Sequence, residues 1–83
     1  MDKAIKLIES ARSGPGSFPF DDLCRLAELI GFVFRHQSGS HRIYRHPETK
    51  AMMNFQPDKR DKSKAKPYQV RHLLKYIEEH KNV

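Results

Sequence analysis

Residues 31–46, GFVFRHQSGSHRIYRH, decide the fold, because they read as the end of a helix followed by a β-hairpin. Gly31 can stop a preceding helix in the left-handed conformation. Residues 32–37 form the first expected strand, and residues 41–46 form the strand that returns. The tight turn SGS, residues 38–40, joins them, since its glycine takes positive φ without steric penalty. The hairpin therefore presents a histidine at the start of its second strand.

Helical patterns lie on both sides of the hairpin. Residues 3–12 place apolar side chains on one face at helical spacing, and the sequence SGPGS that follows interrupts this pattern. A second helix is expected over residues 19–30, opening on a proline that the first turn tolerates. The last helix is expected over residues 67–80, again opening on a proline. Its apolar stripe consists of Val70, Leu73, Leu74 and Ile77.

A third strand over residues 51–55, closed by Pro57, completes the pattern. The fold class is therefore α+β. Helices 19–30 and 67–80 are expected to cover one face of a three-stranded antiparallel sheet, with the short N-terminal helix at an edge.

Alternation along the strands predicts which side chains enter the core. Phe32 and Phe34 share a face of the first strand and are expected inside. In the second strand Ile43 and Tyr44 are adjacent, and both fit the core. The sequence leaves that choice open, and with it the face that carries His41.

Length and charge limit the function further. Eighty-three residues predict a single domain, 1–83, in which residues 1–12 form a helical extension. A net charge of +6 and a pI near 9.7 favour an acidic partner, such as nucleic acid, an anionic membrane or an acidic protein. No apolar run approaches the roughly 20 residues of a membrane span, and no signal peptide is visible. The lone Cys24 is expected to be a core residue, so we expect a soluble protein of the reducing cytoplasm.

His41 is the candidate catalytic residue. Cleavage of RNA can use the ribose 2′-hydroxyl as nucleophile, so the protein must supply a base and cations for the phosphate charge. His41 can be that base, with Arg35, Arg42 and Arg45 beside it in sequence and the Ser40 hydroxyl in the turn. A lone hairpin histidine can equally be an ordinary surface residue. Neither a metal-ligand spacing nor a Ser/His/Asp arrangement is present, so no metal and no cofactor are expected.

Further cations follow the third strand. The segment 58–66, DKRDKSKAK, is polar and mostly basic, and the last helix adds a basic face. Both features can be explained as a solvated loop and a solvated helix face that have no role in binding. Alternatively, they contact the backbone of an RNA. The candidate phosphate-binding residues here are Lys59, Arg60, Lys62, Lys64, Lys66 and Arg71.

The motif Gly31-Phe32, Arg35, Ser38-Gly39-Ser40-His41 and Tyr44 resembles the signature of the HicA toxins, the mRNA interferases of HicA–HicB toxin–antitoxin pairs. The similarity covers residues 18–80 and includes the basic KPYQVR segment that leads into the last helix. It implies a small α-β-β-β-α fold similar to double-stranded-RNA-binding domains, with His41 as the functional histidine. It also implies mRNA as substrate and a HicB-like antitoxin as partner. Because this chain is cationic, we expect the antitoxin's contacting surface to be acidic.

Two departures from the family pattern stand out. Asp58 follows Pro57 where many members carry a further histidine, so no role for that histidine is carried over. Tyr68-Gln69 replaces the common Gly-Thr at the start of the last helix. The sequence thus predicts a metal-independent endoribonuclease that uses His41 as general acid or base. The alternative is a non-catalytic RNA-binding module, which the same fold and charge would serve.

Overall fold

The computed structural model describes residues 2–80 and confirms the α+β fold class, with a three-stranded antiparallel sheet in the order β1-β2-β3. The elements are α1 (Asp2–Ser13), the 3₁₀ turn η1 (Pro15–Ser17), α2 (Phe20–Leu29), β1 (Val33–Ser38), β2 (His41–Arg45), β3 (Met52–Phe55) and α3 (Pro67–His80). The α-helices and strands lie within about two residues of their expected positions, and η1 falls in the segment that was expected only to interrupt the first helix.

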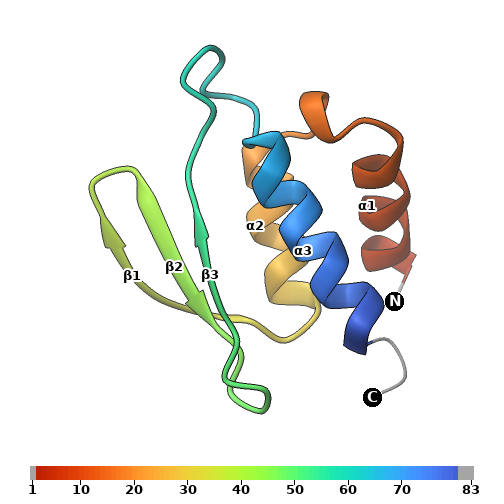
Figure 1. The fold of residues 1–83 in the computed structure, drawn as a ribbon, viewed down its shortest axis with the longest axis vertical. Helices are drawn as coiled ribbons and strands as arrows, with labels where there is room; N and C mark the ends of the chain where they lie inside the picture. Colours follow the sequence, from red (N-terminus) through yellow and green to blue (C-terminus); the bar gives the residue numbers. More distant parts are fainter. Residues whose placement is uncertain (1, 81–83) are drawn as a thin grey trace.

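The helices α2 and α3 lie together on one face of the sheet and leave the other face open (Figure 1). The sequence led us to expect the first helix, α1, at an edge of the sheet, but it does not lie there. It packs on α2 and α3 on the side away from the sheet, where Ala11 is fully buried. An ion pair of 3.4 Å between Arg12 Nη2 and Glu78 Oε1 joins it to α3. The extension therefore thickens the helical layer and leaves the sheet uncovered.

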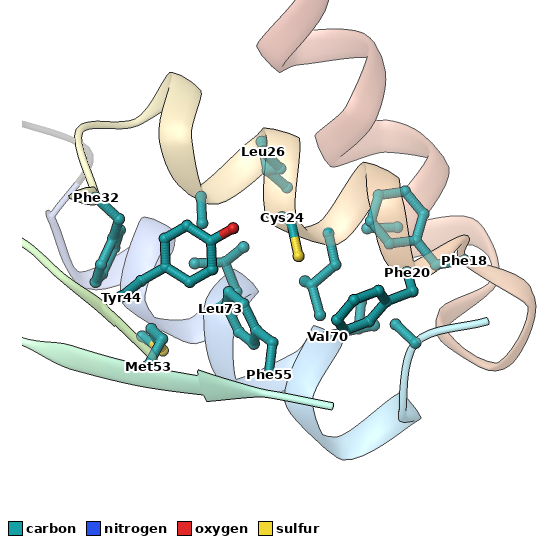
Figure 2. Close-up of a cluster of buried hydrophobic side chains, with 14 of the residues drawn as sticks. Phe18, Phe20, Cys24, Leu26, Phe32, Tyr44, Met53, Phe55, Val70 and Leu73 are labelled. Atoms are coloured by element: carbon teal, nitrogen blue, oxygen red, sulfur yellow. The ribbon is translucent and has the colours of Figure 1, made fainter. Parts of the chain in front are cut away.

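The core fills the space between the helical layer and the inner face of the sheet (Figure 2). Tyr44, Met53 and Phe55 enter it from the strands, and all are 2% exposed or less. Leu23, Leu26, Val70 and Leu73 meet them from the helices and are fully buried. The burial of Tyr44 settles the face that the sequence left open. Because neighbouring strand residues point to opposite faces, His41 and Ile43 lie on the outer side.

Phe34 differs from the expectation, since its side chain is 45% exposed while Phe32 is 2% exposed. β1 is an edge strand, and at Phe34 it lies beyond the cover of the helices, where the ring makes an edge contact with Tyr44, 5.6 Å between centroids. The register then shifts between Phe34 and His36, which makes Arg35 the extra residue of a β-bulge. After the bulge, His36 lies opposite Ile43 on the outer face.

Gly31 and His46 fix the lower end of the hairpin to the end of α2. Gly31 has a φ of +109°, as expected for a glycine that ends a helix. A Cβ built on it would lie 2.6 Å from His46 Nε2, so only glycine leaves room for the imidazole. That ring is 9% exposed, and its Nε2 donates to the Ile30 carbonyl at 3.3 Å. Its Nδ1 accepts the backbone N–H of Glu48 at 3.2 Å.

Candidate active site

His41 is held at the tip of the hairpin by the turn that precedes it. Ser38 and His41 are paired residues of β1 and β2, so only Gly39 and Ser40 lie between the strands. Gly39 has a φ of +60°, as the turn requires, and its carbonyl accepts the Gln37 side-chain amide at 2.9 Å. The imidazole leaves this turn on the open face of the sheet and is partly exposed.

Asn54 on β3 orients the imidazole. Its Oδ1 lies 2.9 Å from His41 Nδ1. A carbonyl oxygen only accepts hydrogen bonds, so Nδ1 carries the proton and Nε2 keeps its lone pair. The residues that the structure describes provide no second hydrogen-bond partner for this ring. An imidazole fixed in this way can accept a proton at Nε2 from a molecule on the open face.

Sequence reasoning missed Asn54, although one signal was available. Asparagine is depleted in strands, and Asn54 interrupts the otherwise apolar run AMMNF. Its contact with His41 depends on the register of β2 and β3, in which Asn54 lies opposite Ile43 and is therefore diagonal to His41. No local pattern in the sequence gives that register.

The open face around His41 mixes polar and apolar side chains. His36, Ile43 and Asn54 form one row across the three strands. A second row consists of Val33, Arg45 and Met52. Its two apolar residues are largely exposed, Val33 at 48% and Met52 at 58%. This face can thus contact a ligand or a partner through both kinds of group.

Arg42 lies on the opposite side of the strand from His41. Its Nη1 is 3.8 Å from Cys24 Sγ, and its guanidinium lies 5.3 Å from the centroid of the Phe20 ring. The cation therefore packs on α2 and does not stand beside the imidazole. Burial raises the pKa of the Cys24 thiol, which keeps it protonated and fits its expected role as a core residue.

Arg35 and Arg45 come together at the far end of the hairpin from His41. With Lys50, Val33 and Pro47 they line a shallow hollow of about 230 Å³. Arg45 lies four residues along β2 from His41, or about 13 Å at the usual strand rise. These cations form a group distinct from the imidazole, whereas Ser40 is next to it in the turn and is exposed.

The basic segment 58–66 is an ordered loop whose acidic side chains bond within the segment itself. Asp58 Oδ1 accepts the Arg60 backbone N–H at 2.8 Å, and Asp61 Oδ1 accepts the Ser63 hydroxyl at 2.7 Å. The Ser63 hydrogen bonds lower the pKa of the Asp61 carboxyl. With both carboxylates engaged in turns, the cations that the segment exposes to solvent are Lys59, Arg60 and Lys62.

The ends of the segment are tied to the rest of the fold. Its backbone bonds to the start of α2, with Phe20 N–H donating to the Ser63 carbonyl at 2.9 Å. Lys64 is partly buried and pairs with Pro19 in an isolated β-bridge. Lys66 Nζ donates to Gln56 Oε1 at 2.9 Å, and Arg71 is exposed on α3. Of the candidate phosphate binders here, Lys59, Lys62 and Arg71 are exposed. Arg60 is exposed too, but its Nε lies 3.6 Å from Asp58 Oδ1, and Lys64 and Lys66 are partly engaged.

Residues 2–80 contain no group of three or more His, Cys, Asp or Glu side chains arranged to hold a metal ion. The evenly spaced histidines illustrate the reason, since His36 and His41 lie on the outer face while His46 is buried on the inner one. Nor, within the same residues, is any helix both long enough and apolar enough to cross a membrane.

Comparison with known proteins identifies the family. A family model described as the HicA toxin of bacterial toxin–antitoxin systems matches residues 20–78 of the 83-residue chain. No curated protein and no solved structure gave a match. Because the match covers most of the chain, including the hairpin with His41 and the basic segment, the chain belongs to the HicA toxin family, which implies a HicB-type antitoxin as partner.

Proposed function

We propose that this HicA-family chain is an endoribonuclease that cleaves mRNA without a metal ion, with His41 as the general base. The observation that carries the proposal is the 2.9 Å hydrogen bond between His41 Nδ1 and Asn54 Oδ1. It fixes the imidazole on an open, partly apolar face with Nε2 available to a substrate. The exposed cations of the basic segment support RNA as that substrate.

The reaction needs only groups that the chain and RNA provide. His41 Nε2 takes the proton of a ribose 2′-hydroxyl, the 2′-oxygen bonds to the adjacent phosphorus, and the bond from phosphorus to the 5′-oxygen breaks. In-line displacement puts the entering and leaving oxygens on opposite sides of phosphorus, so a single imidazole serves one of them. We assign it to the 2′-hydroxyl, while water protonates the leaving 5′-oxygen. The products are a 2′,3′-cyclic phosphate and a 5′-hydroxyl.

The cations bind the strand on either side of the scissile bond. Lys59, Arg60 and Lys62 are exposed on the basic segment and hold phosphates on one side. Arg35 and Arg45 hold phosphates further along the hairpin, where Lys50 joins them. The exposed Ser40 hydroxyl, next to His41 in the turn, donates a hydrogen bond to an oxygen of the scissile phosphate. Arg42, turned toward α2, contributes to packing and only indirectly to the charge of the site.

We further propose that the HicB-type antitoxin inhibits by covering the open face of the sheet. Exposed Val33 and Met52 offer it apolar area, and an acidic surface would complement the cations around them. RNA and antitoxin should then compete for His41→Ala protein. Simultaneous binding of both, without mutual weakening, would show that the antitoxin acts from elsewhere.

The test of the catalytic proposal compares wild type with His41→Ala and with His36→Ala, a second histidine on the same face. Each protein is incubated with a labelled mRNA in excess EDTA. His41→Ala should lose cleavage by at least about 100-fold, the usual contribution of a general base, while His36→Ala cleaves normally. Thermal unfolding should place both variants within about 1 kcal/mol of wild type, since both rings lie at the surface.

Cleavage by folded His41→Ala at the wild-type rate would overturn the assignment. If the wild type binds the RNA but leaves it intact with and without EDTA, the chain is an RNA-binding module. If the wild type cleaves the RNA without EDTA but not with it, the reaction uses a metal ion.

A further inference from the structure

Tyr68 is an aromatic side chain that the proposed reaction does not use. It stands in the first turn of α3 and is 59% exposed, whereas Tyr44 and Tyr76 are 2% and 8% exposed. A single exposed aromatic residue is common on protein surfaces and indicates nothing by itself. The surroundings of this one, however, give it a specific chemistry.

The Tyr68 ring borders a shallow hollow of about 350 Å³ whose wall is rich in cations. Lys59, Arg60 and Lys66 line it, together with Asp58 and Pro67. Asp58 Oδ1 accepts the Arg60 backbone N–H at 2.8 Å and lies 3.6 Å from Arg60 Nε. The Asp58 side chain is only 16% exposed, whereas the Arg60 side chain is 89% exposed. The hollow thus offers a flat aromatic ring beside positive charge.

Hydrogen bonds hold the ring and one of the cations in place. The Tyr68 hydroxyl accepts the Gln69 side-chain amide at 3.3 Å, and Gln69 Oε1 accepts the Gln56 backbone N–H at 2.9 Å. Gln56 Oε1 in turn accepts Lys66 Nζ at 2.9 Å. Gln69 is 6% exposed, so this connection is anchored in the interior. A ring fixed in advance loses little conformational entropy when a ligand stacks on it.

The hollow and the imidazole lie at the same end of the sheet. Asn54, which bonds to His41, is two residues before Gln56, which is about 7 Å along an extended chain. The β1–β2 turn and the start of α3 are both in the upper half of the molecule (Figure 1). Because α3 packs on the face opposite to His41, an RNA strand that contacts both must pass around this end of the sheet, beyond the end of β3.

We propose that Tyr68 is a stacking platform for one unpaired base of the RNA, with Arg60 and Lys66 holding the adjoining phosphate. This subsite rests on the proposed function, since it binds the same strand that His41 cleaves. An aromatic ring accepts any base through its π-face, so the subsite selects an unpaired nucleotide and is tolerant of sequence. An acidic peptide would use the cations but would leave the ring without a partner.

The experiment uses the absence of tryptophan from this chain. In a His41→Ala background, Tyr68→Trp introduces the sole indole, and its fluorescence reports contact with an RNA oligonucleotide. Stacking should quench it. A series of oligonucleotides is then compared, each of which lacks the base at a different position but keeps every phosphate. The quenching should disappear for the oligonucleotide whose missing base is the one that stacks on the indole.

Affinities in the same background test the energetic contribution. Tyr68→Ala should bind RNA about tenfold more weakly, and Tyr68→Phe should bind within about threefold of the parent, because stacking on an aromatic ring contributes most of the effect. The salt dependence of binding should be unchanged in Tyr68→Ala, since every cation that binds a phosphate is still present. Ile5→Ala is the matched control, because Ile5 is 48% exposed on α1, away from the sheet.

Affinity of Tyr68→Ala within twofold of the parent would overturn the subsite, as would quenching that no abasic position relieves. Weaker antitoxin binding with unchanged RNA binding would assign the hollow to the protein partner and also overturn it. The indole assay decides the question even if Tyr68→Ala fails to fold. These binding readouts are independent of catalysis, so an inactive wild type would refute the proposed reaction without touching the subsite.

Discussion

Replacing Gly31 with alanine should destabilise the protein more than the same change at any other described glycine. Gly31 has a φ of +109°, which an L-residue rarely adopts, and the new Cβ would lie 2.6 Å from His46 Nε2. The backbone strain and the displaced imidazole act together. The end of α2 and the turn between β2 and β3 should therefore both loosen.

The expected loss of stability follows from these two effects. Positive φ costs an alanine about 1–2 kcal/mol. Moving His46 breaks its hydrogen bond to the Ile30 carbonyl, about 1 kcal/mol. It also disturbs the edge contact with Phe32, 5.3 Å between ring centroids, which is about 1 kcal/mol. Alanine also lowers the conformational entropy of the unfolded chain, which offsets roughly 0.5 kcal/mol of this loss. The free energy of unfolding should fall by about 3 kcal/mol.

Equilibrium urea unfolding of Gly31→Ala, Gly39→Ala and Gly16→Ala measures this. Gly39 has a φ of +60° with open space around it, so its variant should lose only about 1 kcal/mol from strain. Gly16 has neither a positive φ nor a neighbour within 4 Å, so its variant should match or slightly exceed wild type. Equal losses at Gly31 and Gly39 would refute the account of Gly31, because they would show that contact with His46 costs nothing.

Two further predictions concern the candidate site. Asn54→Ala should lower kcat about 10- to 100-fold with little change in KM, because the imidazole loses its orientation. Asn54→Asp should restore most of the lost rate, since a carboxylate oxygen also accepts the Nδ1 hydrogen bond; a wild-type kcat in Asn54→Ala would remove Asn54 from the mechanism. Charge reversal at four positions of the basic segment should weaken RNA binding and flatten the slope of log affinity against log salt by about 0.7 for each phosphate that the protein no longer neutralises. An unaltered slope would make the segment a solvated loop. The four positions are Lys59, Arg60, Lys62 and Lys64.

Local sequence signals predicted the elements well. Gly31 followed the end of α2, Pro67 opened α3 while Pro19 stood just before α2, and the SGS turn set the hairpin, because each of these features acts within a few residues. The position of His41 at the tip of the hairpin followed from the same signals. These parts of the fold depend on backbone preference and periodicity, which the sequence carries directly.

Features that depend on register or on distant packing could not be read from the sequence. The choice between Ile43 and Tyr44 decides which face each side chain of β2 takes, so the sequence left open whether His41 lies on the outer face and Arg42 on the inner one. The bulge at Arg35 changes the alternation within β1, and Phe34 is exposed because the helices do not reach the edge of the sheet. The bond between His41 and Asn54 needs the pairing of β2 with β3.

The central claim is that His41 activates a ribose 2′-hydroxyl, and a single substitution in the substrate tests it most directly. An RNA oligonucleotide cleaved by the wild type is compared with the same oligonucleotide carrying a 2′-deoxy sugar at the scissile position. We predict that the deoxy substrate binds but resists cleavage at that bond, while the ribose substrate yields a 2′,3′-cyclic phosphate. Cleavage of the deoxy bond at a comparable rate would contradict the claim, because water or another nucleophile would then be attacking the phosphorus.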